Sequence, residues 1–371
     1  MIHSIYLITA LLATVPMIYA QDTNTADVHA DVQTQWKMLF AEFSEKKDKL
    51  ETECKTASKQ RQIDIRQKLN SLPREYAPRM LDCAKSNLSD TNAFDPLFWI
   101  VLTLEKGKYV DESLKLLKEH FADETDIMNL WMLLPELVKI HSDEVNPFLR
   151  SVLQNNSADL YRGSACLYLA IRLKNQAERT GDNILADESE RLLRRAIDEF
   201  AKTRCRRGSV GNEAKRELKN LRGPLGIGHM APNIKGKDLD GAKFSLADYR
   251  GKVVLLSFCG QWCVPCRKMY PHEQSLLDEL AGKPFVFIEV NSDRDRIAHR
   301  KFMEENGYTW RCFGDGRQGP IASAWNIQAS PTYFVLDHKG IIRYKAVGPV
   351  DEATLHHWTD TLINKRLGKR P

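Results

Sequence analysis

Helical spacing of apolar residues marks the chain from about Asp27 to Leu221. Apolar residues recur there at positions i, i+3, i+4 and i+7, which lie on one face of an α-helix. Three such stripes are Trp36, Leu39, Phe40 and Phe43; Cys166, Leu169, Ala170 and Leu173; and Leu193, Ala196, Ile197 and Phe200. This part of the sequence lacks the extended apolar/polar alternation of a half-buried strand. We therefore predict an all-helical domain of antiparallel hairpins over residues 21–221.

Proline and glycine interrupt these stripes. We expect helices to be broken at Pro73, Pro78, Pro96, Pro147 and the segment Gly181-Asp182-Asn183. The helix pair over residues 161–200 is similar to a tetratricopeptide or HEAT-type hairpin, although no fixed period runs through the domain. An array of helix pairs would offer a concave binding surface, and a packing scaffold is the alternative.

The pattern changes near residue 222. Residues 222–228 hold three glycines and a proline, which predicts a linker. Strands are expected over residues 253–259, 285–291, 333–336 and 341–347, with a hairpin turn at Asp240-Gly241. Helices are expected after the first of these strands, over residues 296–306, and around the stripe that includes Leu355 and Leu362. Strands alternating with helices predict an α/β domain over residues 229–371, and hence an α + α/β chain.

The first twenty residues resemble a targeting segment. An apolar run from Ile5 to Met17 is followed by Ala20 and then polar residues, as in a secretory signal. The segment is either cleaved after Ala20 or kept as a membrane anchor, and in both cases the folded part lies outside the cytoplasm. The net charge of +5 is spread along the 371 residues, which argues against a nucleic-acid-binding protein. Eight cysteines are too few for a disulfide scaffold, so their positions matter.

The candidate chemistry lies in Cys263-Val264-Pro265-Cys266. At the start of a helix, the first sulfur meets unpaired N–H groups and the positive end of the helix dipole, which stabilise a thiolate. Cys263 is then the nucleophile, and Cys266 is the resolving thiol that releases a mixed disulfide. Haem attachment would need a histidine where Arg267 stands, and a zinc site would need a second pair of ligands. A structural disulfide is the remaining alternative.

The surrounding residues resemble the active site of thioredoxin-like proteins. The stretch from Phe258 to Arg267 carries this resemblance. The segment from Ala231 to Val253, at the start of the domain, is similar to the redoxin/TlpA branch of the thioredoxin-like proteins. The resemblance covers residues 229–371 and implies a thioredoxin-like redoxin domain that works as an extracytoplasmic thiol–disulfide oxidoreductase. It implies that Ser330-Pro331 is the cis-proline loop, and that this loop and Trp262 face an extended substrate segment.

The same resemblance implies the partners. Client proteins with disulfide bonds would be the substrates, and a membrane electron carrier or another thioredoxin-like protein would restore the dithiol. No cofactor and no metal are expected. A binding or assembly protein that keeps the fold with little turnover is one rival interpretation. A thiol peroxidase is another, although the peroxidatic motif of that group is missing before Cys263.

Two acids typical of the family are absent. Thioredoxin has a buried aspartate where Ser257 stands, and many TlpA-type relatives have a glutamate at the position of Met269. Glu289, in the predicted strand 285–291, aligns with a buried lysine of thioredoxin. We predict that Glu289 is a displaced base for Cys266; a strand-end carboxylate facing solvent is the alternative.

The remaining cysteines are outside this motif. Cys166 lies on an apolar stripe and is expected in the core, and Cys205 is expected to end a helix. A Cys54–Cys83 disulfide across a helix break at Leu72-Pro73 is as plausible as two separate thiols. Cys259 and Cys312 are expected to be free thiols, with a mutual disulfide or a relay to Cys263 as alternatives.

Overall fold

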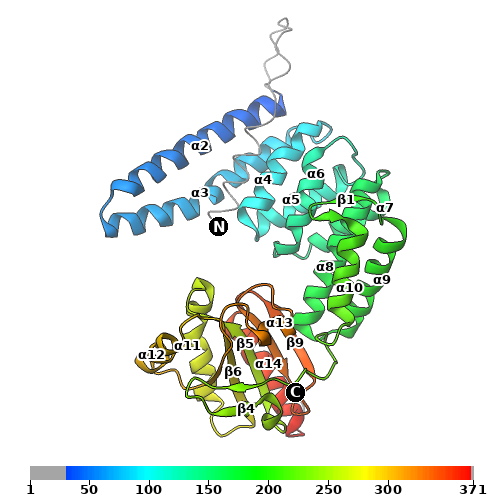
Figure 1. Ribbon diagram of the computed structural model, residues 1–371. Coiled ribbons are helices and arrows are strands. Elements are labelled where there is room, and N and C mark those ends of the chain that lie inside the picture. The colour runs from blue at the N-terminus through cyan, green and yellow to red at the C-terminus, as the bar shows by residue number, and fades with distance from the viewer. Residues whose placement is uncertain (1–30, 369–371) are drawn as a thin grey trace, which may run out of the picture. The chain divides into compact units, whose positions relative to one another are not determined.

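The computed structural model describes residues 31–368 (Figure 1). The predicted targeting segment over residues 1–20 lies outside them. Within the described range, no helix is long and apolar enough to cross a membrane. The chain forms two compact units: residues up to Leu169 with 195–214, and residues 170–194 with the chain from Lys215 onward. The second unit therefore includes parts of the helical region besides the sheet domain.

The part before residue 223 is helical, as predicted. A short hairpin of strands β1 (Arg204–Cys205) and β2 (Gly208–Ser209) is the exception among the described residues. The helices are α2 (Val32–Thr56), α3 (Lys59–Lys85), α4 (Phe94–Leu104), α5 (Lys108–His120), α6 (Met128–Glu136), α7 (Val145–Asn155), α8 (Asp159–Thr180), α9 (Asn183–Glu199) and α10 (Val210–Arg222).

The first hairpin differs from the sequence-based expectation. Pro73 and Pro78 lie inside α3, so the helix breaks predicted at these prolines are wrong. A proline removes one backbone hydrogen bond, but tertiary packing can hold a helix together. Here α3 runs along α2 and buries Leu72, Tyr76 and Met80. The chain reverses instead at Ala57 and Ser58, and the Ser58 side chain caps α3.

The position of this turn separates the first two cysteines. Cys54 lies beside the turn, whereas Cys83 lies near the far end of α3, roughly 30 Å away at 1.5 Å per helical residue. Both are free thiols, so the Cys54–Cys83 disulfide does not form. Cys166 is fully buried, as predicted. Cys205 lies in β1 and is buried there, so its predicted place at a helix end is wrong.

The sheet domain has five strands in the order β7-β6-β5-β8-β9. β5, β6 and β7 are parallel, and β8 and β9 are antiparallel to their neighbours. The strands are β3 (Lys235–Lys237), β4 (Lys243–Ser245), β5 (Val253–Cys259), β6 (Phe285–Asn291), β7 (Arg311–Gly314), β8 (Thr332–Leu336) and β9 (Ile342–Val347). The helices are α11 (Val264–Glu279), α12 (Arg296–Asn306), α13 (Pro320–Ala324) and α14 (Glu352–Arg366).

Both faces of this sheet are covered. On one face, side chains of α11 and α14, such as Tyr270 and Trp358, pack on β5 and its neighbours. The β3–β4 hairpin and Trp325, which follows α13, pack on the other face. The alternation along β5 decides the two environments, because Ser257 and Cys259 face α11 while Leu256 and Phe258 face the hairpin. β5 is thus buried along its whole length.

Residues 170–194 pack within the same unit as the sheet. The indole N–H of Trp358 in α14 donates a 2.6 Å hydrogen bond to the carbonyl oxygen of Arg179. The ammonium of Lys345 in β9 lies 3.5 Å from the carboxylate of Glu178. These contacts tie the end of α8 to the sheet domain.

Candidate active site

The Cys263–Cys266 pair lies at the start of α11, just after the end of β5. Cys263 is the N-cap residue of α11, and its sulfur accepts the backbone N–H of Cys266 at 3.2 Å. The two cysteines form a disulfide with a Cα–Cα distance of 5.2 Å. Both side chains are buried, with exposed fractions of 4% and 0%. After reduction, the N-terminal end of the helix favours the thiolate form of Cys263.

The loop before β8 faces this disulfide. The Ser330–Pro331 peptide bond is cis, and the sulfur of Cys263 lies 3.4 Å from the carbonyl oxygen of Ser330. Pro331 is buried and Ser330 is half-buried. The sequence-predicted residues of the cis-proline loop therefore lie next to the sequence-predicted nucleophile.

Trp262 presents an exposed aromatic surface beside the disulfide. Its side chain is 61% exposed, and its indole N–H donates to the hydroxyl of Ser292 at 3.0 Å. That hydroxyl donates in turn to the carbonyl oxygen of Cys259 at 2.8 Å. The backbone N–H of Gln261 donates to the carboxylate of Asp293 at 2.9 Å. These bonds anchor the loop between β5 and α11 to the end of β6.

Glu289 is fully buried, so the alternative of a carboxylate facing solvent is wrong. Its oxygens accept hydrogen bonds from Tyr270 (3.2 Å), Asn291 (3.0 Å) and Trp310 (2.8 Å), and the His299 ring nitrogen Nε2 lies 3.5 Å away. Burial alone would raise the pKa of Glu289, but His299, Trp310 and Asn291 hold it below the ordinary value. The pKa of His299 is raised against the effect of burial by the same carboxylate.

A second buried carboxylate, Glu273, was not predicted from the sequence. It lies on α11 two turns after Cys266, and its exposed fraction is 1%. The hydroxyl of Tyr333 donates to Glu273 Oε1 at 2.7 Å, while Oε2 has no hydrogen-bond partner. Burial raises the pKa of Glu273 to about 8. The signal in the sequence was the i, i+7 spacing from Cys266, which puts both side chains on one helix face.

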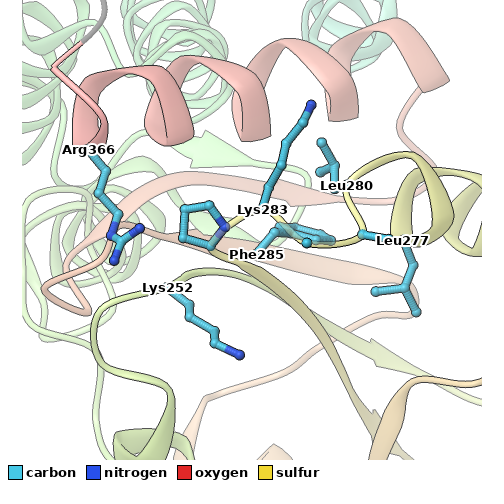
Figure 2. A pocket seen from close by; sticks show the side chains of 9 residues that line it. Lys252, Leu277, Leu280, Lys283, Phe285 and Arg366 are labelled. Carbon is cyan, nitrogen blue, oxygen red and sulfur yellow. The ribbon is translucent and has the colours of Figure 1, made fainter.

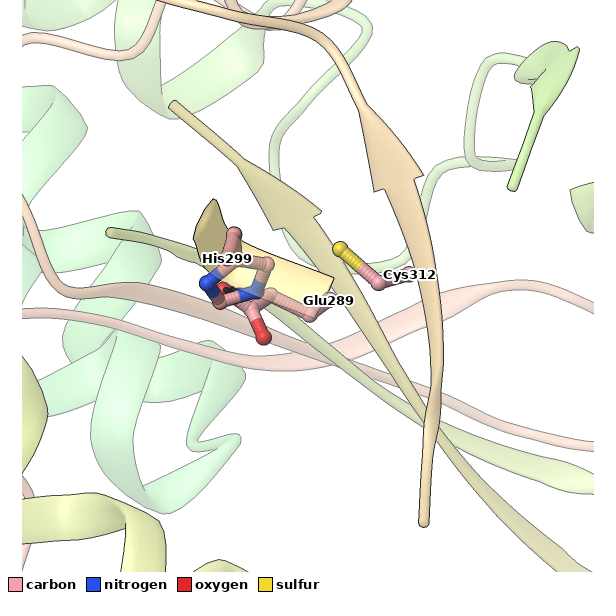
Figure 3. Close-up of side chains that lie close together, drawn as sticks. All are labelled: Glu289, His299 and Cys312. Atoms are coloured by element: carbon pink, nitrogen blue, oxygen red, sulfur yellow. Dashed lines mark ion pairs between the residues drawn. The ribbon is translucent and has the colours of Figure 1, made fainter. Parts of the chain in front are cut away.

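Cys259 and Cys312 are buried free thiols, as predicted. Burial raises the pKa of both groups well above its ordinary value. Protonated thiols are poor nucleophiles, so a relay to Cys263 finds no support in these environments. Cys312 also belongs to a buried group with Glu289 and His299, whose ligand atoms lie within 4.8 Å of one another (Figure 3).

A pocket of about 500 Å³ lies away from the disulfide (Figure 2). Its lining includes Lys252, which precedes β5, and Phe285, which begins β6. The pocket is therefore at the amino ends of the parallel strands, whereas Cys263 follows the carboxyl end of β5. Leu277, Leu280, Lys283 and Arg366 also line it. This cavity and the disulfide therefore lie at opposite ends of the parallel strands.

Comparison with known proteins finds sequences and structures that are similar to the sheet domain. Residues 227–345 match the AhpC/TSA family. The thiol-disulfide oxidoreductase ResA of Geobacillus kaustophilus is 29% identical over 138 residues, which are 37% of this chain and 79% of that protein. ResA of Bacillus thuringiensis (strain Al Hakam) is 33% identical over 122 residues, which are 33% of this chain and 70% of that protein. A solved thiol:disulfide interchange protein from Bacteroides sp. is 28% identical, with a TM-score of 0.34, over 38% of this chain and 91% of that one.

Proposed function

Because the chain belongs, through its sheet domain, to the ResA family of thiol-disulfide oxidoreductases, we propose that it is an exported reductase of protein disulfides acting through Cys263 and Cys266. The observation that carries this proposal is the disulfide at the start of α11, with the cis Ser330–Pro331 loop against it. A structural disulfide would not need an exposed tryptophan and a cis-proline loop beside it.

The reaction begins with the reduced pair. The Cys263 thiolate attacks one sulfur of the client disulfide, so that a mixed disulfide forms and one client thiolate leaves. Cys266 loses its proton and attacks the sulfur of Cys263. The second client thiolate then leaves, and two electrons have moved from the pair to the client. An electron donor of the same thiol chemistry restores the dithiol.

The client segment would lie along the Ser330–Pro331 loop. The backbone there offers hydrogen-bonding groups beside the sulfur of Cys263, at 3.4 Å for the Ser330 carbonyl oxygen. Trp262, with its indole N–H fixed by Ser292, offers a rigid apolar surface next to the same sulfur. Aromatic side chains held in this way contribute strongly to binding of partner proteins.

Deprotonation of Cys266 needs an acceptor. The assignment of Glu289 to this role stays a prediction, and the three hydrogen bonds to its carboxylate compete with it. Glu273 is a second candidate, because it shares the helix face of Cys266 and has an oxygen without a partner. The seven-residue spacing separates the two Cα atoms by about 10 Å along the helix, so this role requires a water molecule to carry the proton between them. The Glu273 pKa of about 8 allows this carboxylate to take and return a proton near neutral pH.

Export is proposed from the segment over residues 1–20 and from the thiol chemistry. The N-terminal mass of protein recovered from outside the cytoplasm tests it: processing after Ala20 is expected, and an unprocessed cytoplasmic chain would contradict export. The helical domain is proposed to recruit clients, which predicts that deletion of residues 21–221 changes client selectivity. The contacts of Arg179 and Glu178 with the sheet domain require that the truncated chain is first shown to fold.

The reductase proposal is tested by trapping the mixed disulfide. The Cys266→Ser variant should accumulate a covalent adduct with a disulfide-bearing client such as insulin, because the resolving thiol is missing. The Cys263→Ser variant should form none, and the Cys259→Ser variant should behave as the wild type. Equal adduct formation by the Cys263→Ser variant would contradict the assignment of the nucleophile.

A further inference from the structure

Three potential metal ligands of different chemistry meet inside the sheet domain. Glu289 in β6 pairs directly with Cys312 in β7, and His299 comes from α12 (Figure 3). Their exposed fractions are 0%, 2% and 0%, and a carboxylate oxygen, a thiol sulfur and an imidazole nitrogen lie within 4.8 Å of one another. Carboxylate oxygen, thiolate sulfur and imidazole nitrogen are each ligands of zinc in proteins.

The imidazole of His299 is oriented as a ligand would be. Its Nδ1 lies 3.3 Å from the carboxylate of Asp293, which accepts a hydrogen bond from the Nδ1–H tautomer. The amide nitrogen of Gln261 lies 3.2 Å from the same Nδ1, so the Nδ1–H tautomer requires the Gln261 amide to turn its oxygen toward the ring. Its Nε2 is fully buried, has no hydrogen-bond partner, and lies 3.5 Å from Glu289 Oε1. When Nδ1–H donates to Asp293, the lone pair of Nε2 is directed into the cluster. A carboxylate behind the far ring nitrogen is the usual support of a metal-bound histidine.

Three donors hold the carboxylate of Glu289, two of them on Oε1 and one on Oε2. Tyr270, Asn291 and Trp310 all donate to it, which fixes its orientation as supporting hydrogen bonds do around metal ligands. Net charge also favours the arrangement. A divalent cation with one carboxylate, one thiolate and one neutral imidazole gives a charge of zero for the ion and its three ligands, which is far less costly to bury than a charged group. The carboxylate of Asp293, behind His299, adds a negative charge that is partly exposed to solvent.

We propose that Glu289, His299 and Cys312 bind one Zn²⁺ ion, with the fourth coordination position open to a water molecule. Zinc takes these three donor types readily and has no redox chemistry of its own. The competing arrangement is a protonated imidazole between Glu289 and Asp293, with Cys312 as an ordinary buried thiol. That arrangement needs no ion, and it has no thiolate.

The site has two consequences for the neighbouring chemistry. A zinc-bound Cys312 is withheld from disulfide exchange with Cys263 and Cys266, which matters in an oxidising setting. A zinc-bound Glu289 is not available as a base, so the base and zinc roles of this carboxylate exclude each other. The zinc proposal does not depend on the reductase proposal, because the site is defined without the disulfide.

Metal titration of the oxidised full-length protein tests the proposal. The Cys263–Cys266 disulfide must be intact, because the reduced pair is itself a possible zinc ligand. We expect one equivalent of Zn²⁺ per chain. With Co²⁺ as the probe, we expect a thiolate-to-metal charge-transfer band. Cys312→Ser and His299→Gln should each lower the affinity by tenfold or more. Cys259→Ser is the matched control, a buried free thiol on the same sheet face and outside the group, and it should keep full affinity.

Thermal unfolding gives a second measurement. Zn²⁺ should raise the unfolding temperature of the wild type and of Cys259→Ser, because a ligand that binds the folded state stabilises it, and should leave the other two variants unchanged. If a variant fails to fold, the thiolate-to-metal charge-transfer band of the Co²⁺-bound wild type still tests whether a cysteine binds the metal. No stoichiometric binding by the oxidised wild type, a Co²⁺ complex without thiolate charge transfer, or equal binding by Cys312→Ser would each overturn the proposal.

Discussion

The hydroxyl of Tyr333 donates a 2.7 Å hydrogen bond to Oε1 of Glu273, and this pair joins β8 to α11 beneath the active-site disulfide. Tyr333 comes two residues after Pro331, and Glu273 comes seven residues after Cys266. The bond therefore links the substrate-facing loop to the redox helix through one buried carboxylate. The other oxygen of that carboxylate has no partner.

Glu273 should give the protein a pH-dependent stability. Its pKa is about 8 in the folded protein against an ordinary value of 4.5, so the folded state binds the extra proton between these values. Proton binding by Glu273 therefore stabilises the folded state fully below pH 4.5, and this stabilisation is lost as the pH rises through about 8. Between these values the free energy of unfolding should fall by about 1.4 kcal/mol per pH unit. Chemical denaturation from pH 4 to pH 9 measures it.

The variant Glu273→Gln should abolish most of this slope and be more stable than the wild type above pH 8. Asp278→Asn, at an exposed position on the same helix, is the matched control and should keep the wild-type slope. A Glu273→Gln variant with an unchanged pH profile of its free energy of unfolding would show that Glu273 titrates normally.

The same carboxylate should govern the resolving step. We expect Glu273→Gln to slow the attack of Cys266 on the mixed disulfide by about 100-fold at neutral pH, the scale of general-base catalysis. The loss should shrink as hydroxide takes over at high pH. Single-turnover resolution, followed by quenched alkylation across the pH range, separates this step from client binding.

Glu289→Gln is the decisive comparison for the proton acceptor. An unchanged pH profile in Glu289→Gln, together with a shifted profile in Glu273→Gln, supports Glu273. The opposite pattern would return the role to Glu289, as the sequence alone had suggested, and would argue against zinc at that carboxylate under the assay conditions.

Trp262 should contribute to client binding and not to the redox potential. Its side chain is 61% exposed beside Cys263. We expect Trp262→Ala to raise KM for a protein client about tenfold, equal to about 1.4 kcal/mol, with little change in kcat. Met230→Ala serves as the control. Its side chain is 55% exposed, and it lies away from Cys263, where Met230 pairs with Ile341 just before β9. A change in kcat alone would contradict a binding role.

Trp358 should anchor the end of α8 to the redoxin fold. Trp358→Phe keeps the stacking on Tyr344, whose ring lies 5.3 Å away, but leaves the carbonyl oxygen of Arg179 without its donor. We expect a loss of about 1–3 kcal/mol in the free energy of unfolding of the sheet-containing unit. An unchanged denaturation midpoint would mean that residues 170–194 do not stabilise this fold.

Much of the sheet domain could be predicted because its buried strands are continuous apolar runs. β5 and β6 have the predicted bounds, and β8 and β9 differ from prediction by one residue. β7 was missed because it has four residues and begins with the charged Arg311. The helix breaks at Pro73 and Pro78 were wrong because packing of α3 on α2 outweighs the local preference of proline.

Some active-site residues could also be predicted from the sequence, and others could not. Cys263, Cys266 and Pro331 are visible in the sequence because their chemistry depends on residue type and local spacing. Glu273 could be recognised as buried only once α11 was known to continue through Pro271. The group of Glu289, His299 and Cys312 depends on three separate elements, and no local spacing connects them.

A redox titration of the full-length protein in thiol buffers, with alkylation and mass mapping of every cysteine, tests the central claim most directly. We predict that Cys263 and Cys266 cycle together as one two-electron couple, with a midpoint near the thioredoxin value of about −270 mV. Cys259 and Cys312 should remain outside that couple. A midpoint near about −120 mV would mark an oxidant instead of a reductase, and a Cys263–Cys266 pair that does not cycle would contradict the catalytic account.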